Sequence, residues 1–339
     1  MIIMSPRAKK AEVDAVVRRI RAVGLKADVS IGEAQTVIGI IGDESRINFD
    51  QMNSMAGVES TKRIQAPYKL MTKEYLQEDR ITVTVNDYSF GGGEVLYIAG
   101  PCSVESYDQL ARIGEQVKVA GAHMLRGGTF KPRTSVHSFQ GLGEEGLKHL
   151  RRVGKQLQMP TVTEVRSERQ AELVAEYADI LQIGTRNMYN QDLLEAVAKQ
   201  GKPILFKRGQ SSQISEFLSF GQYIVANGNR RIILCERGIT PLGGAFEQDT
   251  RNTLDISAVP VLMSKTPFPI IVDPSHATGK RELVLPMSMA AVAAGAHGLI
   301  IEVHDKPEEA LSDGAQSLKP DQLKGLIRRC NAISRLARD

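Results

Sequence analysis

The amino-acid sequence predicts an α/β protein in which a TIM (β/α)8 barrel is preceded by a small ferredoxin-like βαββαβ domain. The main observation is a run of eight short apolar segments between residues 95 and 339, each followed by a stretch of helical periodicity. Residues 95–339 also have the length that such a barrel needs, about 250 residues. A second observation is that residues 1–66 read as strand, helix, two strands, helix and strand, which is the ferredoxin-like order.

Residues 1–66 supply the elements of the small domain. Val13, Val16, Val17 and Ile20 fall at helical spacing, and Gly24 ends this helix. The other predicted elements are strands over 1–5, 25–32, 35–42 and 58–65 and a helix over 45–57. The segment carries no glycine-rich phosphate loop, no metal-type spacing and no carboxylate pair. It therefore fits either a folding or oligomerisation unit or a small-molecule sensor, and both readings stay open.

Residues 67–94 are predicted to be a linker between the two domains. Within it, residues 81–93 (ITVTVNDYSFGGG) alternate in polarity around an Asn-Asp turn. Alternation on both sides of such a turn is typical of a β-hairpin, so one is expected here.

The eight apolar segments of residues 95–339 are the predicted barrel strands. They are LYIAGPC, HMLRGGTF, PTVTEV, DILQIG, PILFKRG, RIILCERG, PIIVDPSH and GLIIEVH. The sixth is the weakest, because the loop ITPLGGAFEQDTRN separates it from its helix. A doubly wound sheet is the rival, but its first turn is glycine-rich and the first turn here is AGPCSVES. The barrel is therefore preferred.

Composition excludes several classes of protein. The net charge of +4 is small and dispersed, tryptophan is absent and aromatic residues are 5%, so no nucleic-acid partner is expected. No apolar run reaches the roughly 18 residues of a membrane span, and MIIMSPRAKK lacks the order of a secretory signal. The three cysteines are odd in number and widely spaced, which argues against a disulfide framework. We expect a cytoplasmic protein that has no membrane partner.

Ionisable side chains follow the apolar part of most predicted strands. In a barrel these carboxyl-terminal ends meet at one mouth, where active sites lie. Six cations would converge there: Arg126, Lys131, Arg133, Arg186, Lys207 and Arg237. Crowded like charges need anions, which fits two phosphorylated substrates, or a phosphate and a carboxylate on each of two ligands. The structural alternative is that some of these cations pair with Glu164, Glu236 or Asp273.

A second group of residues has the chemistry of a metal site. Cys102, His276, Glu302 and Asp313 follow the first, seventh and eighth strands, which are neighbours in a closed barrel. A thiolate, an imidazole and two carboxylates suit a divalent transition metal. Glu302 and His304 share strand parity, so alternation leaves open which of the two faces the site. Cys235 and Cys330 are expected to be packing residues.

Several ordered blocks resemble the 3-deoxy-D-arabino-heptulosonate 7-phosphate (DAHP) synthases, and more narrowly their type I beta form. The blocks are AGPCSVES, LRGGTFKPRTS, SFQGLGEEGL, QIGTRN, LFKRG, ILCERG, DPSHATG, IIEVH and LSDGAQSL. The resemblance covers the whole barrel, and residues 1–66 resemble the ferredoxin-like (ACT-like) regulatory extension of that family. It implies condensation of phosphoenolpyruvate with erythrose 4-phosphate, the first step of the shikimate pathway towards chorismate and the aromatic amino acids.

The resemblance also assigns roles to residues. It implies that Cys102, His276, Glu302 and Asp313 bind a divalent metal ion of the Mn, Fe, Co or Zn class. It implies that Arg126, Lys131, Arg186, Lys207 and Arg237 hold phosphoenolpyruvate, and that Pro132, Arg133 and Thr134 receive the aldose phosphate. Lys131, His276 and Cys102 are the expected catalytic residues, with Lys131 as proton donor. The family loop usually continues KPRTSPYSFQG, whereas Val136 and His137 follow Ser135 here, which removes a proline but no charge.

The family resemblance leaves two alternative functions and one expectation about regulation. The related 3-deoxy-octulosonate 8-phosphate synthases, which use arabinose 5-phosphate, carry a KANRSS-like loop where this chain reads KPRTS. A non-catalytic sensor of aromatic amino acids is the second alternative. For an active enzyme, the resemblance implies feedback inhibition by tyrosine or phenylalanine and a homotetramer.

Overall fold

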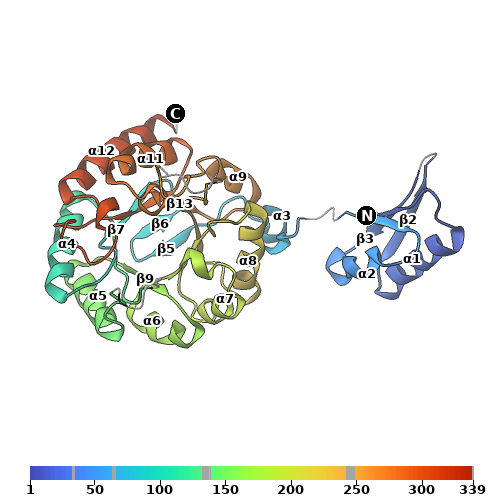
Figure 1. The fold of residues 1–339 in the computed structure, drawn as a ribbon, viewed down its shortest axis with the longest axis horizontal. Coiled ribbons are helices and arrows are strands. Elements are labelled where there is room, and N and C mark those ends of the chain that lie inside the picture. The colour runs from blue at the N-terminus through green and yellow to red at the C-terminus, as the bar shows by residue number, and fades with distance from the viewer. Residues whose placement is uncertain (33–34, 63–65, 132–136, 138, 242–248, 338–339) are drawn as a thin grey trace. The chain divides into compact units, whose positions relative to one another are not determined.

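The computed structural model describes residues 1–339 except 33–34, 63–65, 132–136, 138, 242–248 and 338–339. The chain divides into two compact units, Met1–Lys69 and Leu70–Asp339. Each unit is built around its own buried apolar residues, and each is described in turn (Figure 1).

The first unit is a four-stranded antiparallel sheet with two helices. Its elements are β1 (Ile2–Met4), α1 (Lys10–Ala22), β2 (Lys26–Ile31), β3 (Thr36–Ile41), η1 (Glu44–Arg46), α2 (Phe49–Asn53) and β4 (Val58–Thr61). The strand order is β2-β3-β1-β4, and the predicted ferredoxin-like order is confirmed. Val16, Val17 and Ile20 of α1 are buried with Ile2 and Ile38 of the sheet, as their helical spacing predicted.

The second unit contains a closed barrel of eight parallel strands, which confirms the predicted TIM barrel (Figure 1). The strands are β7 (Leu96–Gly100), β8 (Met124–Arg126), β9 (Thr161–Val165), β10 (Ile180–Ile183), β11 (Ile204–Lys207), β12 (Ile232–Glu236), β13 (Ile270–Val272) and β14 (Gly298–Glu302). One strand lies in each predicted segment. The barrel closes where β14 pairs with β7, with Ile300 opposite Ile98. Both faces of these strands are buried, which is why they read as continuous apolar runs.

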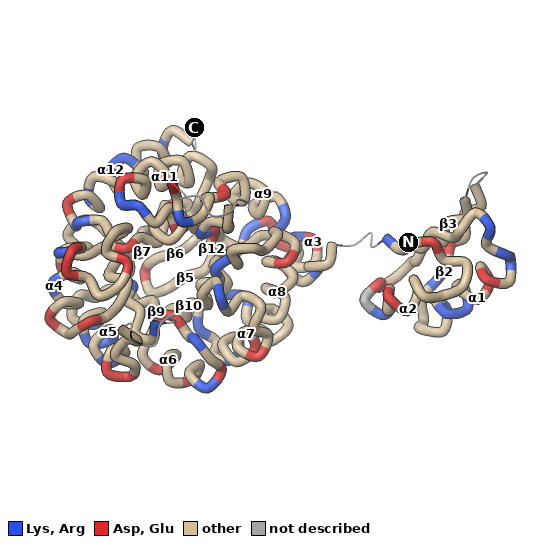
Figure 2. The backbone as a smooth tube through the Cα atoms, in the orientation of Figure 1, with Lys and Arg blue, Asp and Glu red and all other residues tan. Residues whose placement is uncertain are grey.

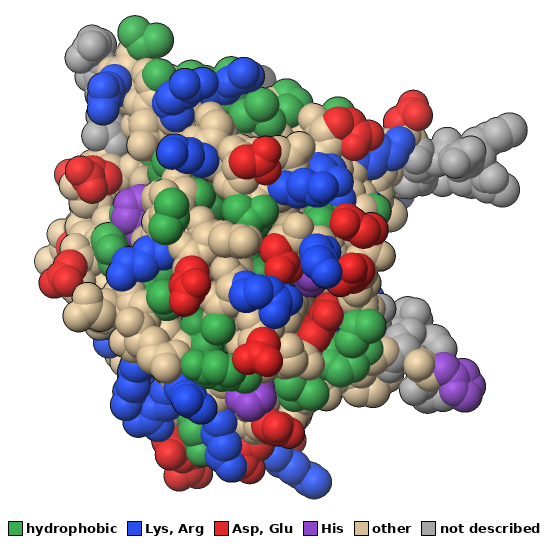
Figure 3. Space-filling model, turned by 90° about the vertical axis from the view of Figure 1, so that its left-hand side faces the viewer, with side chains coloured by type: hydrophobic (Ala, Val, Ile, Leu, Met, Phe, Trp, Pro, Cys, Tyr) green, Lys and Arg blue, Asp and Glu red, His purple; other side chains and the backbone are tan. Residues whose placement is uncertain are grey.

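Helices surround the barrel on its outer side. They are α4 (Tyr107–Ala120), α5 (Glu144–Leu157), α6 (Ala171–Tyr177), α7 (Gln191–Ala198), α8 (Ile214–Ala226), α9 (Ala258–Lys265), α11 (Arg281–Ala293) and α12 (Pro320–Leu336). Local sequence sets their ends: Ser106 accepts a hydrogen bond from the Gln109 N–H at the start of α4, and Gly121 ends that helix at φ +102°. On the face around α4, acidic and basic side chains are interspersed (Figure 3).

Short elements complete the second unit. They are η2 (Lys69–Met71), α3 (Lys73–Leu76), η3 (Glu168–Gln170), η4 (Thr185–Asn187), α10 (Pro274–Thr278) and η5 (Gly314–Gln316). The predicted hairpin is present as β5 (Val83–Val85) and β6 (Tyr88–Phe90). Phe90 is fully buried beside Gly298, the first residue of β14, so the hairpin covers the amino-terminal end of the barrel. Across the described residues, no helix has the length and apolar character needed to span a bilayer.

Candidate active site

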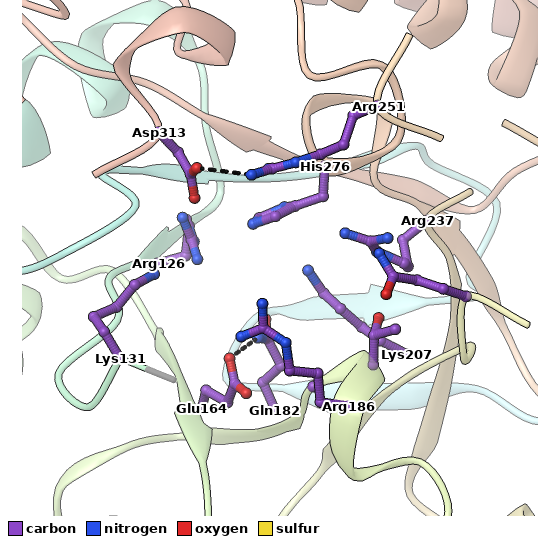
Figure 4. A pocket seen from close by; sticks show the side chains of 13 residues that line it. Arg126, Lys131, Glu164, Gln182, Arg186, Lys207, Arg237, Arg251, His276 and Asp313 are labelled. Carbon is purple, nitrogen blue, oxygen red and sulfur yellow. Dashed lines mark hydrogen bonds and ion pairs between the residues drawn. The ribbon is translucent and has the colours of Figure 1, made fainter. Parts of the chain in front are cut away.

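A cavity of about 310 Å³ lies at the carboxyl-terminal ends of the barrel strands. Its lining comes from several strands and from the loops that follow them (Figure 4). The lining residues are Arg126, Lys131, Glu164, Gln182, Gly184, Thr185, Arg186, Lys207, Gln210, Arg237, Arg251, His276 and Asp313. Most of these side chains are polar or charged, as expected of a site for a polar ligand. Lys and Arg positions occur inside the ring of helices as well as on its outer side (Figure 2).

Five of the six predicted cations line this cavity. They are Arg126, Lys131, Arg186, Lys207 and Arg237. Arg133, Pro132 and Thr134 lie outside the described residues. A further cation, Arg251, also lines the cavity and was missed. It comes from the long loop after β12, far from the strand end, so a rule based on strand ends could not find it.

Three of the cavity cations form buried polar contacts with the protein itself. Arg126 Nη1 donates to Glu302 Oε1 at 2.7 Å. Lys131 Nζ lies 2.9 Å from Cys102 Sγ. Lys207 Nζ contacts Asp273 Oδ2 at 2.5 Å, so the structural alternative applies to this lysine. These contacts hold the cations at the edge of the cavity and offset part of the cost of burying them.

Glu236, another acid considered as a partner, is bound to an arginine that the sequence analysis did not single out. Arg208 Nη1 donates to Glu236 Oε2 and to Asp255 Oδ2, both at 2.9 Å. Glu236 Oε1 also accepts the Gly238 N–H at 2.6 Å. These buried contacts fix the backbone on either side of Arg237 and next to Lys207. Arg208 therefore has a structural role, as the partner of Glu236 and Asp255, while its sequence neighbour Lys207 lines the cavity.

Arg237 differs from the other buried cations of the cavity. Its residue is 6% exposed, and its Nη1 has no hydrogen-bond partner within the described part of the chain. Burial lowers the pKa of the Arg237 guanidinium from its ordinary value, and the nearby Asp273 offsets this only in part. A buried, unpaired donor of this kind is unfavourable until an acceptor reaches it. The cavity therefore has a donor ready for an anionic ligand.

The four predicted metal ligands come together beside the cavity. One donor atom from each of Cys102, His276, Glu302 and Asp313 lies within 4.8 Å of all the others. Cys102 Sγ is 3.1 Å from Asp313 Oδ2, and His276 Nε2 is 3.2 Å from Glu302 Oε1. Sulfur, nitrogen and oxygen donors in one cluster fit a divalent transition metal, so the residues present match the implied cofactor.

The structure decides between Glu302 and His304. Glu302 is the last residue of β14 and reaches the donor cluster. His304 has other partners. Its Nε2 lies 3.3 Å from Gln109 Nε2, and its Nδ1 accepts a hydrogen bond from the Lys306 N–H. β14 ends at Glu302, and the next residue, Val303, forms a separate parallel bridge with Leu318, so equal parity along the sequence did not place both side chains at the same site.

Asp273 orients His276. As the N-cap of α10 it accepts the His276 N–H at 2.9 Å, and its Oδ2 lies 2.7 Å from His276 Nδ1. This contact holds the imidazole by Nδ1 and turns Nε2 towards the cluster, an arrangement common in metal-binding histidines. Burial alone would raise the pKa of Asp273, but His276 and Lys207 outweigh it and hold that pKa well below its ordinary value. Asp273 therefore acts as a carboxylate shared by the cluster and the cavity.

Glu164 and Gln182 form a polar pair on another wall of the cavity. Gln182 Nε2 donates to Glu164 Oε2 at 3.3 Å (Figure 4). A Cβ at Gly184 would lie 2.1 Å from Glu164 Oε1, so a larger residue there would displace this carboxylate from its present position. Glu164 was singled out as a possible partner of the cations, whereas Gln182 was missed because it lies in mid-strand and is uncharged.

Comparisons with known proteins agree with this architecture. Residues 70–335 match the model of the DAHP synthetase I family, and residues 1–66 match the DAHP synthase ferredoxin-like domain. The chain is 46% identical over 334 residues to a phospho-2-dehydro-3-deoxyheptonate aldolase of Thermotoga maritima, covering 98% of this chain and 97% of the relative. It is also 34% identical over 275 residues to a 2-dehydro-3-deoxyphosphooctonate aldolase of Desulfosudis oleivorans, covering 76% of this chain and 96% of the relative.

Solved structures show the same likeness. A crystal structure of the Thermotoga maritima DAHP synthase superposes with a TM-score of 0.91 at 44% identity, covering 99% of this chain and 96% of that one. A truncated form of the Thermotoga maritima synthase gives a TM-score of 0.71 and covers 80% of this chain and 97% of its own. With a family model over most of its length and a relative of this identity over nearly all of it, the chain belongs to the DAHP synthetase I family of enzymes.

Proposed function

We propose that this chain condenses phosphoenolpyruvate with D-erythrose 4-phosphate and water to give DAHP and inorganic phosphate. The observation that carries the proposal is the contact between a cation-lined cavity and a Cys-His-Glu-Asp donor cluster at one end of the barrel. The cavity suits anionic groups, and the cluster suits a divalent ion. A reaction between a phosphorylated enol and a phosphorylated aldehyde uses both.

Phosphoenolpyruvate is assigned to the described cations. Arg126, Lys131, Arg186, Lys207 and Arg237 would hold its phosphate and carboxylate, because guanidinium and ammonium groups bind these anions by charge-assisted hydrogen bonds. The unpaired Nη1 of Arg237 supports this assignment most directly. Arg251, on the same cavity wall as His276 and Asp313, adds positive charge next to the donor cluster (Figure 4).

The proposed cofactor is a divalent ion of the Mn, Fe, Co or Zn class, held by Cys102, His276, Glu302 and Asp313. When bound, it would supply Lewis-acid polarisation of the aldehyde oxygen of the aldose. The protein's own contribution is to hold the donors together. His276 is turned by Asp273, and Glu302 is held by Arg126.

The proposed reaction forms a bond between C3 of phosphoenolpyruvate and the aldehyde carbon. Water adds at C2, where positive charge develops, and the resulting hemiketal phosphate expels inorganic phosphate. Lys131 is the proposed donor of a proton to the new alkoxide, directly or through a water molecule. Its Nζ lies between the cavity and Cys102, which supports this role. Much of the rate would come from holding both substrates in order against fixed charges.

The choice of aldose depends on a loop outside the described residues. Pro132, Arg133 and Thr134 are proposed to bind the aldose, with Arg133 and Thr134 near its phosphate. Arabinose 5-phosphate remains the second candidate, because relatives named 2-dehydro-3-deoxyphosphooctonate aldolase match about three quarters of the chain. The match of residues 1–66 to the DAHP synthase ferredoxin-like domain favours erythrose 4-phosphate. Phosphate release measured with each aldose in turn tests the proposal, and a preference for arabinose 5-phosphate would overturn it.

Residues 1–66 are proposed to be a regulatory domain, joined by residues 67–94 to a catalytic barrel of residues 95–339. Tyrosine or phenylalanine is the proposed inhibitor, and a homotetramer is the proposed assembly. The alternative of a purely sensing protein is disfavoured by the complete donor cluster and the cation-lined cavity. The same phosphate-release assay, with tyrosine and phenylalanine added separately, tests regulation and activity together.

A further inference from the structure

A buried glutamine connects the donor cluster to the cavity wall. Gln316, the last residue of η5, is 2% exposed. Its Nε2 donates to Glu302 Oε2 at 2.6 Å, and its Oε1 accepts from Arg251 Nη1 at 3.0 Å. Arg251 Nη2 also lies 3.4 Å from Asp313 Oδ1. Gln316 and Arg251 together therefore contact both carboxylates of the cluster.

The chemistry of its neighbours fixes the orientation of the Gln316 amide. A guanidinium can only donate hydrogen bonds, so Arg251 must face the amide oxygen. An ionised carboxylate can only accept them, so Glu302 must face the amide nitrogen. Glu302 forms a buried ion pair with Arg126, whose Nη1 lies 2.7 Å from Glu302 Oε1, so this carboxyl acts as an acceptor. A flipped amide would lose both contacts, which leaves one allowed arrangement.

The contact with Gln316 also sets the rotation of the Glu302 carboxylate. The last torsion of a glutamate side chain has a broad energy minimum, so hydrogen bonds decide how the carboxylate is turned. Glu302 Oε1 faces Arg126 at 2.7 Å and His276 Nε2 at 3.2 Å. Gln316 holds the other oxygen. Each oxygen therefore has its own partner, and Oε1 is kept towards His276.

The segments that carry Gln316 and Arg251 are themselves anchored. A Cβ at Gly314 would lie 2.0 Å from Pro307 O, and Arg281 donates to the carbonyl oxygens of Gly314 and Ser317, so the η5 turn is held closely. The Arg251 N–H donates to Thr278 O, the end of the short helix that carries His276. A movement of any of these segments would be transmitted to the donors.

We propose that Gln316 is a positioning residue for the metal site, which orients Glu302 directly and restrains Asp313 through Arg251. The inference rests on the proposed function, since it presumes that the four donors bind a metal ion. Outer contacts of this kind typically change metal affinity by about 10- to 100-fold when they are removed.

The test is the affinity of the purified full-length chain for Co²⁺ and Zn²⁺, measured by competition with a chromophoric chelator. Gln316→Met keeps the length of the side chain and removes both hydrogen bonds. We expect it to weaken binding by about 10- to 100-fold and to change the thiolate-to-Co²⁺ absorption band. The control is Gln191→Met on α7, where the exposed amide contacts Glu195 on the surface. That variant should bind both ions like the wild type.

Two further results separate positioning from a general loss of structure. Arg251→Met, whose side chain is 48% exposed, should fold normally and weaken binding less, by about tenfold at most. The double variant should lose less than the product of the two single losses, because the contacts form one chain. Unchanged affinity in Gln316→Met, or full additivity in the double variant, overturns this inference alone. Failure of the wild type to bind one ion per chain overturns the proposed metal site as well.

Discussion

Lys131 Nζ lies 2.9 Å from Cys102 Sγ and 3.1 Å from the Cys102 carbonyl oxygen. This pair is the point at which the proposed anion site and the donor cluster meet. A second contact of this kind joins Arg126, at the end of β8, to Glu302, at the end of β14. These two strands lie on either side of β7 in the barrel. The cavity is therefore not a ring of bare positive charge. Two of its cations, Arg126 and Lys131, are held by groups of the cluster, so we expect the loss of a donor to weaken anion binding as well.

Cys102→Ala should remove the metal ion and abolish turnover together. The thiol supplies the sulfur donor of the cluster, so the loss of affinity should exceed the 10- to 100-fold typical of outer contacts. Metal content after desalting and phosphate release are the measurements. Cys330→Ala, at a buried position in α12, is the control and should keep both. A Cys102→Ala protein that retains a full complement of metal would show that the thiol is only a packing residue.

Arg237→Met should separate binding from stability. Loss of the buried guanidinium should raise KM for phosphoenolpyruvate about 10- to 100-fold, the usual range for a charged hydrogen bond. The same change removes a buried guanidinium whose Nη1 has no partner in the described part of the chain, so the thermal midpoint without substrate should rise by about 2–4 °C.

The control for this variant lies before β12, whereas Arg237 follows that strand. Arg230 precedes β12, is exposed, and lies 3.8 Å from Glu78. Arg230→Met should leave KM unchanged. An unchanged KM in Arg237→Met would remove the main support for the phosphoenolpyruvate assignment.

The sequence predicted the elements more completely than their contacts. Each barrel strand is an apolar run buried on both faces and followed by polar residues, so strand order and the positions of Arg126 and Lys207 could be read directly. Arg251 could not, because a long loop returns it to the cavity through contacts that only the folded chain has. Gln316 was overlooked because its amide has a role only through hydrogen bonds to Arg251 and Glu302, and these contacts exist only in the folded chain. The choice between Glu302 and His304 depended on their contacts, with the donor cluster and with Gln109 respectively, which strand parity does not predict.

Asp273→Asn should weaken metal binding and phosphoenolpyruvate binding in one step. Asp273 contacts His276 Nδ1 on one side and Lys207 Nζ on the other. An asparagine can present its NH₂ group to the imidazole and favour the wrong tautomer, and it no longer neutralises the lysine. We expect metal affinity to fall about 10- to 100-fold and KM to rise. Asp321→Asn, at an exposed position in the first turn of α12, is the control. A change in only one of the two quantities would show that the carboxylate is not shared.

Metal affinity should increase with pH. Burial acts to lower the pKa of His276, but Asp273 and Glu302 outweigh it and raise that pKa to about 10. At neutral pH the imidazole therefore carries a proton that a metal ion at Nε2 must displace. Because the proton competes below the raised pKa, affinity should rise about tenfold for each pH unit up to about pH 10. Chelator competition at about pH 6.5 and about pH 8.5 measures the slope, and a flat profile would contradict the role of His276 as a ligand.

Removal of residues 1–69 should leave an active barrel that aromatic amino acids no longer inhibit. The two compact units divide between Lys69 and Leu70, and the cavity and the donor cluster lie in the second unit. A chain that starts at Leu70 keeps a nitrogen donor, now the terminal amine, beside Gln222 Oε1, and it keeps the buried Met71 against Gly221. Phosphate release with tyrosine or phenylalanine, in the full chain and in the shortened one, measures both properties. If the shortened chain stays active and inhibited, the effector site lies in the barrel; if it folds but is inactive, residues 1–69 contribute to catalysis itself.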